Sequence, residues 1–365
     1  MRITLKRLYG WRSLAGVALA ALGVAGGAFL LGGSEPTSAT ANRFTAYVGN
    51  GGGGVAMSVF MPSSLVVNEG DTINWTNPYP EPHTVSFNAG RPAPTNTMEP
   101  LGEKAPKFDG TQQFSSGFMR RGDNFEVTFI KAGSYTLVCL IHAGQTVDVS
   151  VISPGMHVQT QAQIDSQAKA QFDALKPVGD RLLAGIPAPS RTARADGTTS
   201  WTIPTAPAQD VKGGSVAVMT FVPARLNVGV GDTVTWLNEI PVPHTITFTA
   251  GGPPRAPTQV VRPAGGLYDG SSYVNSGQMG SVPGRSGTSF ALTFTKAGTY
   301  PYICILHVDQ GMAGVVQVGE AMPAISPPST GDAGLQTALA AWPLALVAMA
   351  TGGASLAAMR VRTRA

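Results

Sequence analysis

The sequence predicts an all-β protein with two tandem domains, each a sandwich or barrel of short strands. Two observations support this: a long internal repeat, and short runs of β-branched and aromatic residues between turns within each repeat. The 365 residues include 45 Gly and 28 Pro, and this supply of turn formers favours short strands over a helical bundle.

The repeat defines the domains. Residues 55–87 align without a gap with residues 216–248, and later segments match as well. The matched pairs include Trp75 with Trp236, His83 with His244, Cys139 with Cys304, and His142 with His307. A repeated unit of about 105–110 residues indicates duplicated domains rather than a solenoid of small units. We expect the domains at 43–152 and 211–320, with Trp75 and Trp236 filling their cores.

The segment between the repeats, 153–210, has a different pattern. Its apolar residues recur at helical spacing (Ile164, Ala168, Phe172 and Leu175), and Pro177 is expected to end that helix. Residues 186–210 are rich in Pro, Ala, Thr and Ser, which predicts a linker. We expect the helix to pack on one sandwich or between the two; a partner-binding element is the alternative.

The N-terminus resembles a targeting segment. Residues 1–41 combine a basic start, an apolar run at 13–33 and a small-x-small motif at 39–41, which predicts a secretory signal peptide. An uncleaved membrane anchor is the alternative, because the apolar run is long.

The C-terminus predicts a membrane anchor. A stalk at 321–334 leads to an apolar segment at 335–359, long enough to span a bilayer, and a basic tail at 360–365 that would stay in the cytoplasm. A buried C-terminal helix is the alternative. Residues 328–331 (Pro-Ser-Thr-Gly) resemble a sortase sorting signal, but Pro327 stands where that signal has Leu. The expected location is extracytoplasmic, anchored at a bacterial cell membrane or surface.

Cysteine and histidine are rare and sit at matched places. The chain has 2 Cys and 5 His, and each repeat places one His far upstream of a Cys-x-x-His motif. The candidate ligands are His83, Cys139 and His142 in the first repeat and His244, Cys304, His307 and Met312 in the second. Two imidazoles and one thiolate with a weak axial thioether suit both oxidation states of copper. The pattern therefore predicts a copper site.

These residues resemble the plastocyanin/azurin family of cupredoxins, the blue (type 1) copper proteins, and the resemblance covers both repeats. It implies two Greek-key β-sandwiches, with copper in the second domain and also in the first. In the second repeat it implies His244, Cys304 and His307 as in-plane ligands and Met312 as the axial ligand.

The first repeat departs from this pattern at the axial position. Five residues beyond His142 stands Val147. Gln145 is not expected to be a ligand, because Gln310 occupies the same place in the second repeat, where Met312 serves. We therefore expect no axial ligand or a backbone carbonyl there, and a higher reduction potential than in the second domain. A degenerate, empty first site is the alternative.

Other readings of the two cysteines are less consistent with the sequence. A disulfide is the usual fate of two cysteines in an exported protein, but each cysteine lies in its own matched loop. Zinc binds Cys and His as well, yet neither loop supplies a nearby Glu for hydrolysis.

The sequence does not predict an enzyme. Multicopper oxidases and copper nitrite reductases carry additional histidines, commonly as His-x-His pairs, and only His157 remains here after the two sites are built. A copper-dependent oxidoreductase is thus the least favoured function. We expect a membrane-tethered one-electron carrier that exchanges electrons with redox protein partners; a surface protein for copper buffering or delivery is the alternative. The formal charge of +4 lies largely at the chain ends, so no nucleic-acid partner is expected, and no small-molecule substrate is evident.

Overall fold

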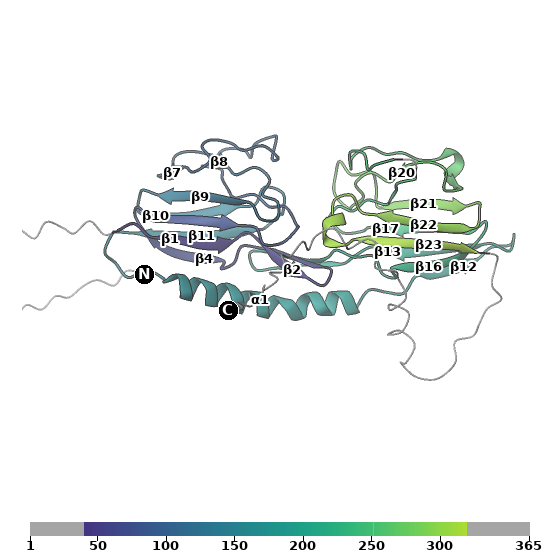
Figure 1. Cartoon of the computed structure of the whole chain (residues 1–365), viewed down its shortest axis with the longest axis horizontal. Helices are drawn as coiled ribbons and strands as arrows, with labels where there is room; N and C mark the ends of the chain where they lie inside the picture. Colours follow the sequence, from purple (N-terminus) through teal and green to yellow (C-terminus); the bar gives the residue numbers. More distant parts are fainter. Residues whose placement is uncertain (1–39, 251, 320–365) are drawn as a thin grey trace, which may run out of the picture.

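The computed structural model describes residues 40–250 and 252–319, which form two β-sandwich domains spanned by one long helix, α1 (Gln161–Ala184) (Figure 1). The predicted all-β class with two domains is confirmed for these residues. The predicted signal peptide, stalk and C-terminal anchor lie outside them, apart from residues 40 and 41. Within the described ranges, no helix has both the length and the apolar character needed to cross a bilayer.

The first domain consists of two facing sheets. One sheet has the order β1 (Arg43–Tyr47), β5 (Thr72–Thr76), β9 (Asn124–Phe129), β7 (Lys107–Phe108). The other has the order β4 (Ser64–Asn68), β11 (Thr146–Ile152), β10 (Gly133–Val138), β6 (Ser86–Phe87), β8 (Phe114–Ser115). Alternate residues of β5 and β9 are buried, as expected for strands with one face on a core. Trp75 lies fully buried there with its ring edge-on to Phe60, so its predicted core position is confirmed.

The second domain repeats this plan. Its first sheet has the order β12 (Ser190–Ala193), β13 (Thr199–Pro204), β17 (Thr233–Leu237), β21 (Ser289–Phe294), β19 (Leu267–Tyr268). Its second sheet has the order β16 (Arg225–Gly229), β23 (Ala313–Gly319), β22 (Gly298–Ile303), β18 (Thr247–Phe248), β20 (Val274–Asn275). Two short 3-10 helices, η1 (Ala264–Gly266) and η2 (Val308–Gln310), lie in its loops. Trp236 is fully buried, as predicted.

The segment predicted as a linker differs in the structure. It contains β12, β13 and β14 (Ala208–Val211), and β13 pairs in parallel with β17 as β1 pairs with β5 in the first domain. Thr199–Pro204 alternates polar and apolar residues around Trp201 and Ile203, a β pattern that the surrounding Pro- and Ala-rich sequence obscures. The second domain therefore begins before residue 211.

A fifth sheet joins the two domains. It has the order β14, β15 (Gly214–Val218), β3 (Val55–Val59), β2 (Asn50–Gly52), and β3 pairs antiparallel with β15. The strands β3 and β15 are matched parts of the repeat. Ala56 pairs with its own equivalent Ala217, and the pairs on either side are images of each other, so the sheet has approximate two-fold symmetry.

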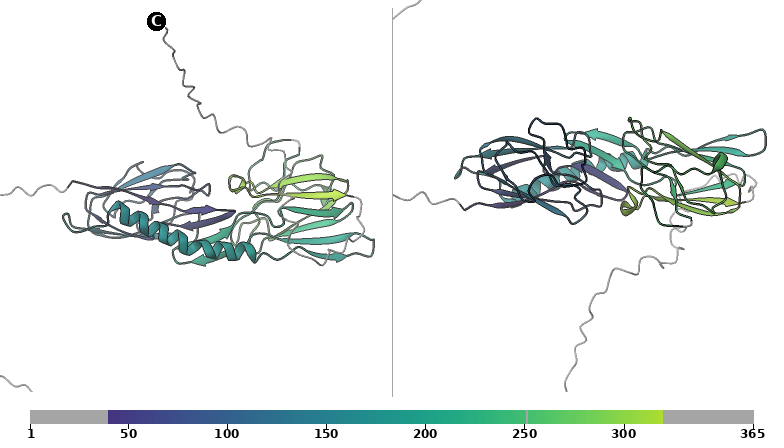
Figure 2. Two further views of the ribbon diagram at one scale, coloured as in Figure 1. Left: turned by 60° about the horizontal axis from the view of Figure 1, so that its bottom comes forward. Right: turned by 90° about the horizontal axis from the view of Figure 1, so that it is seen from above.

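Helix α1 covers one face of this shared sheet and runs from beneath the first domain to the near end of the second (Figure 1 and Figure 2). It starts at a capping box, in which Thr160 and Gln163 satisfy each other's backbone N–H groups. The prediction that Pro177 ends the helix is wrong, because the helix continues to Ala184. Pro177 removes one helical hydrogen bond, but Val178 and Leu182 pack against the shared sheet and hold the last turns in place.

The helix approaches the sheet most closely at Gly179. A Cβ atom at this position would lie 2.6 Å from a methyl group of Val55 on β3. Glycine is unfavourable in a helix interior, so its presence here is explained by this close contact between α1 and the shared sheet.

Gly179→Leu is therefore expected to push α1 off the sheet and to lower the free energy of unfolding by about 1–3 kcal/mol, the usual cost of overpacking. Ala174→Leu, at an exposed position of the same helix, is the matched control and should leave stability nearly unchanged. Thermal unfolding and limited proteolysis of both variants check this; equal stability of the two would contradict the packing role of Gly179.

Candidate metal centres

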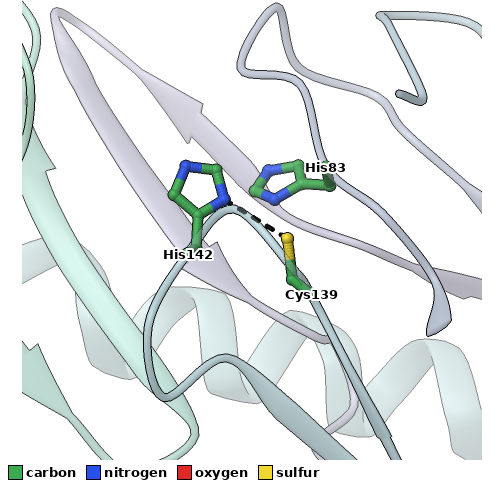
Figure 3. Close-up of side chains that lie close together, drawn as sticks. All are labelled: His83, Cys139 and His142. Atoms are coloured by element: carbon green, nitrogen blue, oxygen red, sulfur yellow. Dashed lines mark hydrogen bonds between the residues drawn. The ribbon is translucent and has the colours of Figure 1, made fainter. Parts of the chain in front are cut away.

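The first cluster is assembled from a loop and a strand end. His83 lies between β5 and β6, and its backbone exchanges two hydrogen bonds with Met119, of 3.2 and 2.8 Å. Cys139 directly follows β10, and His142 lies in the tight loop between β10 and β11. The three side chains point toward one another (Figure 3). Backbone pairing thus fixes the upstream histidine against the Cys-x-x-His loop.

The donor atoms of this first site converge. Cys139 Sγ is 3.5 Å from His142 Nδ1, and the ligand atoms of His83, Cys139 and His142 lie within 4.8 Å of one another. The backbone N–H of Thr84 donates to Cys139 Sγ at 3.3 Å, which stabilises a thiolate. His83 is fully buried and Cys139 is nearly so.

The second domain builds the same cluster, here called the second site, from His244, Cys304 and His307. Cys304 Sγ is 3.4 Å from His307 Nδ1 and 4.0 Å from His244 Nδ1, and Thr245 N–H donates to it at 3.3 Å. The predicted axial residue Met312 is completely buried at the end of the loop, where its carbonyl accepts from Cys304 N–H at 3.0 Å.

Neighbouring charges shift the pKa values of the cysteine and histidine side chains in both clusters. Burial alone would raise the pKa of the Cys139 and Cys304 thiols, but the neighbouring imidazoles outweigh burial and hold these pKa values well below the usual range. Burial likewise opposes protonation of His142 and His307, yet the thiolates and a nearby carboxylate raise both pKa values to about 10. The second site also places His244 Nδ1 only 3.1 Å from His307 Nδ1. Two imidazole nitrogens and a thiolate facing one point form a donor set for a cation.

The strand pairing shows which residue of the first domain corresponds to Met312, and it differs from the sequence-based expectation. Cys139 N–H donates to the carbonyl of Gln145 at 3.0 Å, just as Cys304 N–H donates to that of Met312. The next residue begins the return strand in both domains, Thr146 in β11 and Ala313 in β23. The first loop is shorter, so Gln145 corresponds to Met312 and not to Gln310. The argument from Gln310 that excluded Gln145 as a ligand is therefore wrong.

The Gln145 side chain is oriented toward the first site. Its Nε2 donates to the carbonyl of Val48, which fixes the amide so that Oε1 faces inward. Oε1 lies 3.0 Å from His83 Nδ1, and the residue is 1% exposed. The first site thus has an amide oxygen beside its donor atoms, and the corresponding residue of the second domain is Met312, which carries a thioether.

One acidic residue that the sequence analysis did not single out contacts both sites. Glu81 Oε1 is 3.0 Å from His142 Nε2, and Glu81 Oε2 is 3.6 Å from His307 Nε2. Burial raises the pKa of Glu81, but the two imidazoles outweigh it and hold the pKa far below its usual value. The signal was present in the repeat, since Glu81 aligns with Val242 while the prolines on either side are matched in both repeats.

The two sites differ in exposure. The side chain of His142 is 17% exposed, whereas those of His307 and Glu81 are only 4% and 5% exposed. His157 is exposed and belongs to neither cluster.

Two β-sandwiches, each with a buried His–Cys–His cluster at one end, define a two-domain cupredoxin. Residues 47–152 and 208–319 match the model of the copper binding proteins of the plastocyanin/azurin family, and the chain belongs to this family. It is 30% identical to chloroplastic plastocyanin of Physcomitrium patens over 154 residues, which is 42% of this chain and 76% of that protein. It is 33% identical over 92 residues to amicyanin of Paracoccus denitrificans, 25% of this chain and 54% of that protein.

Among solved structures, a Cu(I) form of an amicyanin variant is 29% identical and matches 37% of this chain and 96% of its own length, with a TM-score of 0.22. The predicted family resemblance is confirmed, and type 1 copper is the cofactor of this family. The converging Nδ1 and Sγ atoms of each domain fit copper in chemistry, so the chain offers two candidate copper sites.

The axial difference predicts different potentials. An amide oxygen is a harder donor than a thioether and favours Cu(II). With Gln145 beside the first site, we therefore expect this site to have the lower potential, the reverse of the expectation drawn from the sequence. We expect Gln145→Met to shift the first site toward Cu(I) by about tenfold, which is about 59 mV for one electron. The reciprocal Met312→Gln should lower the potential of the second site by a similar amount. Potentiometric titration followed in the visible band checks both changes, and a downward shift for Gln145→Met would contradict an axial amide.

Proposed function

We propose that this protein is a one-electron carrier with a type 1 copper in each domain. The observation that carries the proposal is the convergence, in each domain, of two imidazole nitrogens and one cysteine Sγ within 4.8 Å of one another. The family resemblance implies the same function. In the first site Gln145 would supply the axial donor, and in the second Met312.

Copper supplies a one-electron couple between Cu(I) and Cu(II), and the chain keeps its ligands from moving between the two states. His83 and His244 are each held by a pair of backbone hydrogen bonds to a buried methionine. The hydroxyls of Thr84 and Thr245 accept from the residue after each ligand cysteine, both at 2.8 Å. A pre-formed ligand set lowers the rearrangement that each electron transfer requires.

Electrons would enter and leave through the more exposed imidazole. The His142 edge is the accessible one of the two C-terminal histidines, so a redox protein partner would dock beside it. Among the described residues, the two His–Cys–His sets are the groups that could hold a metal ion.

The carrier would be tethered outside the cytoplasm. The basic-apolar pattern of residues 1–41 and the apolar segment at 335–359 with its basic tail support this proposal. Membrane fractionation of cells that express the full chain or a chain ending at residue 320 tests it; full-length protein in the soluble fraction would contradict the tether.

Cys139→Ser and Cys304→Ser test the copper sites separately. Each variant is expected to reduce bound copper from two ions to one per chain and to leave the charge-transfer band and EPR signal of the other site. Copper quantification, visible absorption and EPR of the soluble region measure this. Copper held only as Cu(I), without a visible band or reversible reduction, would reject electron transfer and favour copper delivery.

A further inference from the structure

A single buried carboxylate connects the two sites. Glu81 belongs to the first domain, and its two oxygens face the outer imidazole nitrogens of His142 and His307, which come from different domains. The inner nitrogens of the same two rings face Cys139 and Cys304. A continuous path therefore runs from one cluster through an imidazole, a carboxylate and a second imidazole to the other cluster.

We propose that Glu81 couples the two copper sites, so that they exchange an electron within the molecule and sense each other's charge. This proposal rests on the proposed function. Glu81 acts through the imidazoles and is a positioning residue, since it touches neither cluster's inner donor atoms.

The fold places Glu81 there by several contacts. Asn77 donates to the carbonyl of Glu81 at 2.7 Å and to that of Met119 at 2.8 Å, which pins the loop leading to His83. Gln310 in the second domain donates its amide to Glu81 Oε2. The carboxylate is thus held from both domains.

The shared sheet brings the two loops together. Ala56 and Ala217 occupy the face of this sheet opposite α1, where they contact Tyr79 and Val242 from the loops before His83 and His244. Small side chains at the symmetry position let these loops approach each other. If the second domain also had an acidic residue at the position equivalent to Glu81, the two-fold arrangement would place two carboxylates side by side. Val242 stands at that position instead. One negative charge is therefore shared by two imidazoles.

This charge acts on both sites at once. A carboxylate buried at 5% exposure interacts with nearby charges through a medium of low dielectric constant. It stabilises the more positive, oxidised state of each site and holds the two rings in contact with one group. A charge change at one site consequently reaches the other through Glu81.

The axial donors give the exchange a direction. The amide of Gln145 favours Cu(II) in the first site and the thioether of Met312 favours Cu(I) in the second. The reduced first site would give one electron to the oxidised second site. The first site is then oxidised and the second reduced, and no proton or other reactant is consumed. Electrons would enter at the more accessible His142 edge and pass from there to the buried second site.

Glu81→Gln tests the coupling in two single-site backgrounds, Cys139→Ser and Cys304→Ser. Loss of the shared negative charge should raise the reduction potential of the remaining copper in both backgrounds, by about tenfold in the Cu(I)-to-Cu(II) ratio, or about 59 mV. Glu239→Gln, an exposed residue of the loop before His244, is the charge-matched control and should leave both potentials unchanged. A shift in the reduction potential of only one site, or of neither site, overturns the proposal.

A kinetic measurement on the two-copper protein gives a second readout. After rapid photochemical reduction, wild-type protein should pass the electron from the first site to the second, and Glu81→Val, which removes the bridging carboxylate and introduces the residue of the matched position Val242, should slow this step by about tenfold or more. An unchanged rate overturns the path through Glu81. Thermal melting verifies that each Glu81 variant is folded. If the Glu81→Gln variant does not fold, Glu81→Asp serves instead: it keeps the charge, so both reduction potentials should stay close to those of the parent protein. Failure to bind copper or show a visible band in the parent protein would instead reject the proposed function.

Discussion

The antiparallel pairing of β3 with β15 is the constraint on which the rest of the structure depends. It joins two hairpins into one sheet, and it leaves one face to α1 and the other to the loops that carry the upstream histidines. Because the pairing has a fixed register, the two clusters are held at a fixed separation. The contact of Glu81 with both His142 and His307 follows from that register.

Within this symmetric frame, the chemistry is asymmetric. The two domains share their imidazole and thiolate donors, their threonine contacts and the asparagines that pin the loops, Asn77 and Asn238. Two of their differences lie at the sites, Gln145 against Met312 and Glu81 against Val242. The first difference changes the donor hardness of a site, and the second places one charge between the sites. A duplicated domain has thereby acquired two unequal sites rather than two copies of one.

Much of this structure was predictable from the sequence, because the repeat and the Cys-x-x-His spacing are local patterns. Strand runs around Trp75 and Trp236 and the clustering of His83, Cys139 and His142 follow from them. The role of Gln145 was not predictable by counting residues from His142. The metal loop of the first domain is shorter than that of the second, and only the strand pairing that begins at Thr146 and Ala313 shows which residues of the two loops correspond. The continuation of α1 past Pro177 and the position of Glu81 depend on contacts between domains, which a sequence pattern within one repeat does not contain.

The shared sheet has a consequence for each half of the chain on its own. A two-stranded hairpin such as β2–β3 is at best marginally stable alone, and its open edge exposes unpaired backbone groups. That edge is complementary to β15, which is the repeat equivalent of β3 itself, so it is self-complementary. Two identical single-domain chains would satisfy the same hydrogen bonds by pairing β3 with β3 about a two-fold axis. The present chain therefore has the architecture of a symmetric dimer whose subunits are covalently joined, with α1 as the connection.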